Sequence, residues 1–549
     1  VVTIEGWYNN KEMQDLYSIE LARRGYVVLA LDLHSHGDSE SLSIAELYDG
    51  AVGVDGAVQL IASLPYVDTA RIGVTGHSSG GTAANMAVEI DNSRETPLIA
   101  AVLQQAGDWQ DDTGGDHSGD YGSRSVGIIA STHDDFYFGT YDDAGNMLTN
   151  PAAFMETDGA KKFLNFNEDG FAGIAEGGKY YTRDFDGKTA YRVIYRPNMI
   201  HPLVAFSTTC VGYAIDFFDT TLGAPKPLPA SDQIWPIKAV FNSLGVIGLL
   251  IFMVSFTLVL LDTPVFSALR SGESVQPAPV QDSGAKAWYW VLLIIGAVFS
   301  GASFLFCMNT VYSKTTNFFV QTGPLTIGTW AALCGVFAIF CSAVFYGAYG
   351  KKHGWSARRA GLYLNLEQLW KTIALAVIVI VVSFGLVFAA HYFFQVDYRM
   401  YVVAFKTFGA DKVLIALRYL PFFLLFYVMN SISANCFNYN TIGGKNGNIL
   451  IFAFFNALGA IFVVASQYIY FYATGYQLYG LTEGQRIGPI WLFPCMVLLF
   501  VTPIMSRIIY KRTRNPYIAG LINAMFIVMI SCSNTTTILG GGELIATTF

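Results

Sequence analysis

The sequence predicts two parts of different fold class: a mostly parallel α/β domain over residues 1–231 and an all-α transmembrane domain of about eight helices over residues 232–549. Charge is divided between them. Residues 1–232 hold 33 acidic and 14 basic residues, a net charge of −19, whereas the remainder holds 8 and 19, a net charge of +11. The first part alternates short apolar runs with helical patterns, and the second contains long apolar stretches. With 53% hydrophobic residues, the whole chain is too apolar for one soluble domain.

The short apolar runs of the first part predict its strands. Segments with helical periodicity, 11–24 and 44–64, lie between them, which predicts βαβ units with helices on both faces of the sheet. Asp186-Gly187 predicts a hairpin turn before the last strand. Because Val1 already lies in a predicted core strand, we expect further amino-terminal strands to precede it. The runs are 1–4, 26–31, 72–75, 99–103, 126–131 and 191–195.

The most informative motif is the segment 71–81, RIGVTGHSSGG, which places Ser78 between Gly76 and Gly80. In a G-x-S-x-G segment, a strand turns abruptly into a helix, and the turn exposes the serine hydroxyl above the sheet. Side chains at the two glycine positions would collide with the neighbouring strand or helix. The motif therefore predicts a nucleophilic serine.

Four further segments accompany this motif: EGWYNNKEM after the first strand, ALDLHSHGDSE after the second, ASTHDDFY after a later strand, and NMIHPLVAFS near the end of the domain. Together with PYVDTARIGVTGHSSGG they span nearly all of residues 1–220. The domain resembles the α/β-hydrolase fold, and within it the dienelactone-hydrolase-like esterases of bacteria. The membrane half resembles no family that we identify.

The resemblance implies a catalytic set in the chain order Ser, Asp, His. Ser78 is the expected nucleophile, and His201, after the last strand, is the expected general base. Asp134 is the expected acid that orients the histidine, with the adjacent Asp135 as the alternative.

The resemblance also implies two backbone donors for an oxyanion: the amide of Ser79 and an amide of Trp7 or Tyr8. Relatives often carry His-Gly at the start of this loop. Glu5 stands in the histidine position here, which leaves open whether Trp7 or Tyr8 points inward.

We expect no cofactor and no metal. His34 and His36 belong to the D-x-H-x-H-G loop, which is structural in hydrolases of this fold, and His133 is the third histidine near the same edge. The acidic stretch 108–120 lacks the spacing of a calcium loop, so we expect a solvated loop. The additional segment 139–183 is expected to cover the active site and to carry substrate selectivity.

Eight apolar stretches predict the membrane spans: 234–261, 288–311, 325–349, 372–394, 413–430, 449–472, 490–504 and 518–532. Loops on the side away from the α/β domain hold twelve Lys and Arg residues, against five on its own side. The positive-inside rule then places the α/β domain outside the cell membrane. Arg418, in a predicted span, is the leading candidate for a transport site because ionisable groups in a bilayer are costly.

These observations predict a membrane-integrated serine hydrolase of a bacterial membrane that cleaves an ester, such as a lipid or acyl conjugate. Its expected partners are an ester or lipid-like substrate and membrane lipids. A serine peptidase or acyltransferase of the same fold remains an alternative, as does a transporter or membrane-assembly component with a hydrolase-like extracellular binding domain. The basic loops lack the aromatic interleaving of a nucleic-acid site, so no nucleic-acid partner is expected. Oligomeric state is not predicted.

Overall fold

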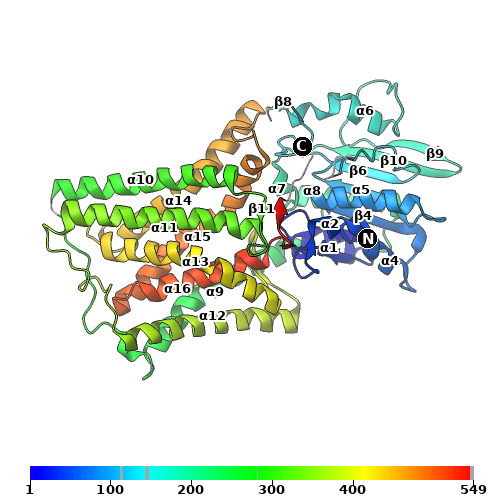
Figure 1. The fold of residues 1–549 in the computed structure, drawn as a ribbon. Helices are drawn as coiled ribbons and strands as arrows, with labels where there is room; N and C mark the ends of the chain where they lie inside the picture. The colour runs from blue at the N-terminus through cyan, green and yellow to red at the C-terminus, as the bar shows by residue number, and fades with distance from the viewer. Residues whose placement is uncertain (112–114, 143–146, 281, 544–549) are drawn as a thin grey trace.

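A computed structural model describes residues 1–111, 115–142, 147–280 and 282–543. Figure 1 shows an α/β domain beside a long bundle of helices. The last helix of the α/β domain, α8 (Thr208–Leu222), is followed by the first long apolar helix, α9 (Trp235–Leu261).

The α/β domain is built on a seven-stranded sheet in the order β2-β1-β4-β5-β6-β10-β9. Neighbouring strands are parallel, except that β9 is antiparallel to β10. Asp186 and Gly187 make the β9–β10 turn with positive φ, as the sequence predicts. The strands are β1 (Val2–Ile4), β2 (Leu29–Leu31), β4 (Ile72–His77), β5 (Ile99–Gln105), β6 (Ser125–Ile129), β9 (Tyr181–Phe185) and β10 (Lys188–Tyr195).

Helices cover both faces of this sheet. On one face, α1 (Asp15–Arg23) and α8 enclose a core that includes Tyr17 and Phe217. On the other, α4 (Val54–Ala62) and α5 (Ser79–Asn92) enclose the second core. A sheet that is buried on both faces explains the nearly continuous apolar runs of its strands.

The helix expected over residues 44–64 is not continuous. It is broken into α2 (Ile44–Leu47), α3 (Asp49–Val52) and α4. Gly50, Ala51 and Gly53 have positive φ, which no right-handed helix accommodates. The break brings the Val52 carbonyl to within 3.1 Å of the His34 amide, so the interruption positions the loop that follows β2.

Among the described residues, seven helices are long and apolar enough to cross a membrane, which corrects the count of about eight spans. The helix in place of the eighth, α16 (Tyr517–Ser533), has 17 residues, about 25 Å, and is largely buried by its neighbours. The seven are α9, α10 (Ser283–Thr310), α11 with its continuation (Thr322–Gly350), α12 (Leu366–Phe394), α13 with its continuation (Ala410–Phe437), α14 (Gly444–Thr474) and α15 (Glu483–Thr513).

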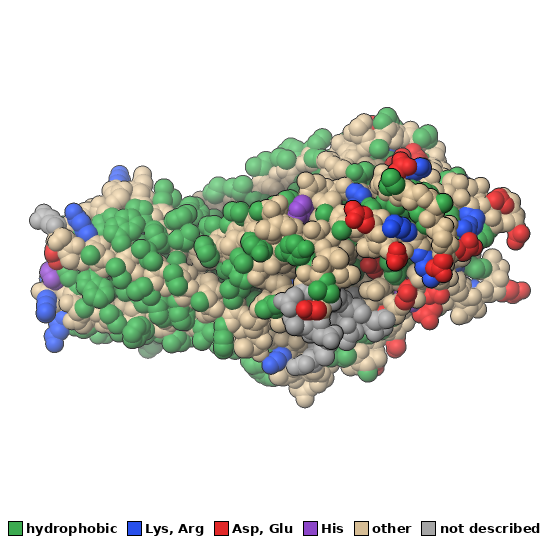
Figure 2. All heavy atoms as spheres, turned by 90° about the horizontal axis from the view of Figure 1, so that it is seen from above, with side chains coloured by type: hydrophobic (Ala, Val, Ile, Leu, Met, Phe, Trp, Pro, Cys, Tyr) green, Lys and Arg blue, Asp and Glu red, His purple; other side chains and the backbone are tan. Residues whose placement is uncertain are grey.

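The two ends of the bundle differ in chemistry. Figure 2 shows Lys and Arg side chains at the end remote from the α/β domain, a broad hydrophobic surface between, and most of the acidic side chains on the α/β domain. An apolar belt between two charged ends is typical of a membrane domain.

The chain returns to the α/β domain after α16. Strand β14 (Ile538–Leu539) pairs with β3 (Leu42–Ser43), and the Thr537 amide donates to the Ser35 carbonyl at 2.8 Å. Residues more than 490 positions apart therefore form one small sheet, so the two domains are joined at both ends of the bundle's sequence.

Candidate functional site

The turn after β4 has the geometry expected of a G-x-S-x-G segment. Ser78 has φ 55° and ψ −125°, a strained conformation for a residue with a side chain. A Cβ on Gly76 would lie 2.2 Å from the Gly80 backbone, and one on Gly80 would lie 2.3 Å from the Glu5 carbonyl oxygen. Close backbone packing thus requires both glycines, as the motif predicts.

His201 and Asp134 meet at the carboxyl edge of the sheet, although 67 positions separate them. His201 Nδ1 lies 2.9 and 3.0 Å from the two Asp134 carboxylate oxygens. Asp134 also accepts hydrogen bonds from the amides of Phe136 and Tyr137 and from the Ser131 hydroxyl. These donors fix the carboxylate, which in turn holds the imidazole with Nε2 as the available nitrogen.

Asp135 does not contact the imidazole ring. Its Oδ2 accepts a hydrogen bond from the His201 amide at 3.3 Å, and its Oδ1 has no hydrogen-bond partner among the described residues. Burial, and then the charge of Asp134, raise the pKa of Asp135 well above its usual range. The structure therefore pairs the ring with Asp134 rather than with its neighbour.

Ser78 and His201 line the same cavity. Ser78 Oγ makes no hydrogen bond to any described residue, including His201. In unliganded enzymes, such contacts are often long and tighten only when substrate binds. The arrangement is that of a serine beside an oriented imidazole.

The predicted oxyanion loop also faces this cavity. Ser79 is the first residue of α5, so its N–H has no intrahelical acceptor. Trp7 and Tyr8 line the cavity beside Ser78, and Tyr8 has φ 63°. A developing oxyanion above Ser78 would also lie at the amino-terminal, positive end of α5.

Glu5 occupies the position where relatives carry histidine. It is fully buried, and its Oε1 accepts a hydrogen bond from the Leu33 amide at 2.7 Å. Burial, and then the charge of Asp32, raise the pKa of Glu5 well above its usual range. Glu5 therefore joins β1 to the loop after β2 as a neutral group.

Sequence reasoning did not single out His77, the residue before the serine. Its ring lies 4.8 Å from the His201 ring, and its Nε2 lies 3.3 Å from the His201 carbonyl oxygen. Burial, and then the charge of His201, lower its pKa to about 3. His77 is thus a neutral neighbour that packs against the candidate base. Its position directly before Ser78 in the G-x-S-x-G segment is the sequence feature from which it could have been predicted.

The bundle contacts each of the three loops that carry the site, through two of its loops and helix α15. Tyr401 donates to the Pro202 carbonyl at 2.8 Å, next to His201. Gln477 donates to the Asp135 carbonyl at 2.6 Å. On the oxyanion loop, the Tyr8 ring lies edge-on to Trp491 at 5.1 Å. No sequence pattern predicts these contacts, because 199 or more positions separate the partners.

The bundle, rather than segment 139–183, forms the opposite wall of the cavity. Among the described residues, none of that segment lines it. The segment instead packs beside the sheet: β9 extends the sheet edge, and Phe163 of α6 (Asp158–Leu164) stacks on Trp109. For the described residues 139–142 and 147–183, the expectation that this segment covers the site is therefore wrong.

Three further histidines have structural contacts. His36 Nε2 lies 2.9 Å from the Thr536 hydroxyl, and its Nδ1 lies 2.9 Å from the His34 carbonyl. The His133 ring packs on Tyr472 of α14 at 4.3 Å. In the acidic stretch, His117 lies between Asp111 and Asp120, while residues 112–114 lie outside the described residues.

Arg418, the candidate for a transport site, donates to the Phe318 carbonyl at 2.9 Å and lies 5.4 Å from the Phe318 ring. These contacts connect α13 to the loop that precedes α11. Asn430 of α13 connects to α14, because it donates to Asn456 at 2.6 Å.

The state of Glu5 generates a prediction about stability. Folded Glu5 keeps its proton at pH values where the unfolded side chain, with a pKa of about 4.3, has lost it. Its contribution is therefore full below about pH 4 and falls as pH rises, by at most about 1.4 kcal/mol per pH unit. Glu5→Gln removes this dependence, because the glutamine side chain does not titrate. The Tm of the variant minus the Tm of wild type should therefore increase from pH 5 to pH 8.

The control is Glu40→Gln, which replaces an exposed glutamate near the same loop. Its Tm should follow that of wild type at each pH. Parallel Tm curves for Glu5→Gln and wild type would contradict a protonated Glu5.

Comparison with known proteins agrees with this geometry. Residues 3–222 match the model of the Alpha/beta hydrolase family. Neither the curated proteins nor the solved structures gave a match. The match ends at the last residue of α8, before the bundle begins. The amino-terminal part of this chain is an α/β-hydrolase domain, followed by a helical region with seven candidate membrane-spanning helices.

Proposed function

We propose that the chain is a membrane-integrated serine hydrolase that cleaves an ester through Ser78, His201 and Asp134. The observation that carries this proposal is the convergence of the Ser78 turn and the His201–Asp134 pair on one cavity. A family match to residues 3–222 supports hydrolase chemistry in general.

The proposed reaction follows from these positions. Ser78 Oγ attacks the ester carbonyl carbon, and its proton passes to His201 Nε2. The Ser79 amide and an amide of the Trp7–Tyr8 loop stabilise the resulting oxyanion. The alcohol leaves with the proton from His201, and water then releases the acid from the acyl-serine by the same steps.

We further propose that the hydrolase domain faces outward. The loops remote from this domain hold twelve Lys and Arg residues, against five on its side, and the positive-inside rule makes the remote loops cytoplasmic.

Orientation is testable with an impermeant maleimide on intact cells. Ser63→Cys, on the exposed surface of the hydrolase domain, should be labelled, whereas Lys352→Cys, in a remote loop, should be labelled only after lysis. The reverse pattern would place the hydrolase domain in the cytoplasm.

A fluorophosphonate probe tests the nucleophile. Wild type in membranes should be labelled, Ser78→Ala should not, and His201→Ala should react at least about a hundredfold more slowly, because general-base catalysis is lost. Ser63→Ala, at an exposed serine outside the site, is the matched control and should react at the wild-type rate.

The acid is assigned with a second pair. Asp134→Asn should slow labelling at least about tenfold more than Asp135→Asn, because only Asp134 contacts the imidazole. Equal effects would contradict this assignment. Absence of labelling in folded wild type would instead favour the binding-domain alternative.

Contact with the bundle also generates a prediction. Tyr401→Phe removes the hydrogen bond to the Pro202 carbonyl, a loss of about 1 kcal/mol, so labelling should slow about fivefold. Tyr392→Phe, in an exposed part of α12, is the control and should leave the rate unchanged.

Both variants should keep the wild-type Tm within about 3 °C, which separates positioning from loss of fold. An unchanged labelling rate for Tyr401→Phe would show that this contact does not position His201.

A further inference from the structure

The cavity at Ser78 continues into the bundle. It has a volume of about 980 Å³, at the upper end of the range for ligand pockets, about 300–1,000 Å³. Its wall follows α11 and its continuation from Gly323 to Gly350, which corresponds to about 40 Å of helix. This exceeds the roughly 30 Å hydrocarbon core of a bilayer. A passage of this length reaches from the site to the remote loops.

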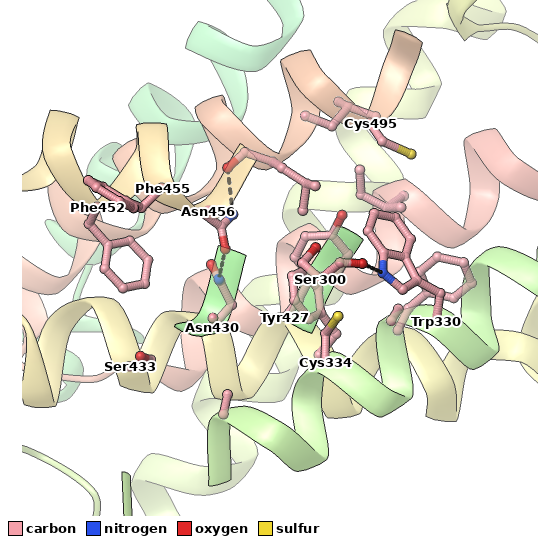
Figure 3. A pocket seen from close by; sticks show the side chains of 18 of the residues that line it. Ser300, Trp330, Cys334, Tyr427, Asn430, Ser433, Phe452, Phe455, Asn456 and Cys495 are labelled. Carbon is pink, nitrogen blue, oxygen red and sulfur yellow. Dashed lines mark hydrogen bonds between the residues drawn. The ribbon is translucent and has the colours of Figure 1, made fainter. Parts of the chain in front are cut away.

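The middle of this wall presents uncharged groups (Figure 3). Its amides are paired within the protein: Asn430 donates to Asn456 at 2.6 Å, and Asn456 donates to the Leu499 carbonyl at 2.6 Å. The Trp330 indole donates to the Ser300 carbonyl at 2.9 Å. Rings and small side chains complete the wall, including Tyr427, Phe452, Phe455, Cys334 and Cys495.

Charged side chains of the wall come from its two ends. Among the described residues, these are Arg399 and Glu483 beside the hydrolase domain, and Glu273, Arg359 and Arg514 at the remote loops. An ion or strongly polar solute would cross the middle without a charged partner, at a high desolvation cost. The wall therefore suits a long, uncharged, apolar occupant.

We propose that this cavity holds the long hydrocarbon chain of the ester substrate, with the ester group at Ser78. This inference rests on the proposed function, and it identifies the substrate class as an ester of a long-chain amphiphile. The chain would lie along the bundle, in the direction in which lipid chains lie in a bilayer. The helices of the bundle would then bind the substrate chain in addition to anchoring the protein.

Two cavity positions provide the test. Ile327 lies on α11, five residues from the helix end beside the hydrolase domain, or about 8 Å along the axis. Gly296 lies on α10, about 21 Å from the corresponding end, and a Cβ there would meet no atom within 4 Å. Ile327→Trp and Gly296→Phe would therefore fill the cavity near the site and farther from it.

Each variant has a matched control outside the cavity. Ile339→Trp changes an exposed isoleucine of the same helix α11. Gly385→Phe changes an exposed glycine of α12, where an added Cβ would likewise meet no atom within 4 Å. Among the described residues, neither lines the cavity.

The measurement is kcat/KM of full-length protein in detergent for p-nitrophenyl esters with acyl chains of about 4 to 20 carbons. A parallel series varies the alcohol chain of acetate esters, and shows which side of the ester carries the chain. The ratio of long-chain to short-chain kcat/KM should fall at least tenfold in Ile327→Trp. In Gly296→Phe, the fall should begin at a longer chain, and in both controls the ratio should stay as in wild type.

Labelling with a short-chain fluorophosphonate measures the folded, reactive fraction of every variant. If one cavity variant is misfolded, the other cavity variant and its control provide the test. Unchanged chain-length profiles in both series for folded Ile327→Trp and Gly296→Phe would overturn the inference while leaving the proposed hydrolase intact. A wild type that is neither labelled nor active on any ester would instead overturn the proposed function.

Discussion

The packing of the helical bundle against the carboxyl edge of the sheet is the constraint on which the candidate site depends. This edge carries the Ser78 turn and the loops of Asp134 and His201. Tyr401 and Gln477, from loops between helices of the bundle, hydrogen-bond to the backbone beside His201 and Asp134. The helical bundle therefore helps to shape the site, and its side chains form one wall of the cavity.

Burial also determines the charges near the site. Glu5 and Asp135 are buried carboxyls whose pKa values are raised, and His77 is a buried imidazole whose pKa is lowered to about 3. All three environments disfavour the charged form, because little water reaches them. The Asp134 carboxylate, in contrast, accepts hydrogen bonds from backbone amides and from Ser131. The site thus combines one hydrogen-bonded carboxylate with neutral neighbours.

Much of the hydrolase domain could be predicted from sequence, because its signals are local. A strand such as β4 is a short apolar run, and the Ser78 turn requires Gly76 and Gly80, which both lie two positions away. The separate pieces of residues 44–64 could not be predicted, since the buried Ala51 has positive φ, which its residue type does not favour. Hydropathy located all seven long helices, and it also predicted a span at 518–532, where the structure has the shorter helix α16. Hydropathy alone cannot separate the two cases, because a helix buried among other helices is as apolar as a span but need not match the bilayer thickness.

The contacts between domains and the cavity could not be predicted either. Tyr401 and Gln477 are ordinary polar residues in loops, and their partners lie 199 and 342 positions earlier in the chain. A cavity depends on how several helices pack together, so the hydrophobic pattern of a single helix does not predict it.

The most direct test of a serine hydrolase with a chain-binding bundle is a structure of the full-length protein after reaction with a fluorophosphonate that carries a long alkyl chain. We predict phosphorus bonded to Ser78 Oγ and density for the chain passing Ile327 between α10 and α11. A chain that instead leaves Ser78 toward solvent or toward segment 139–183 would contradict this prediction.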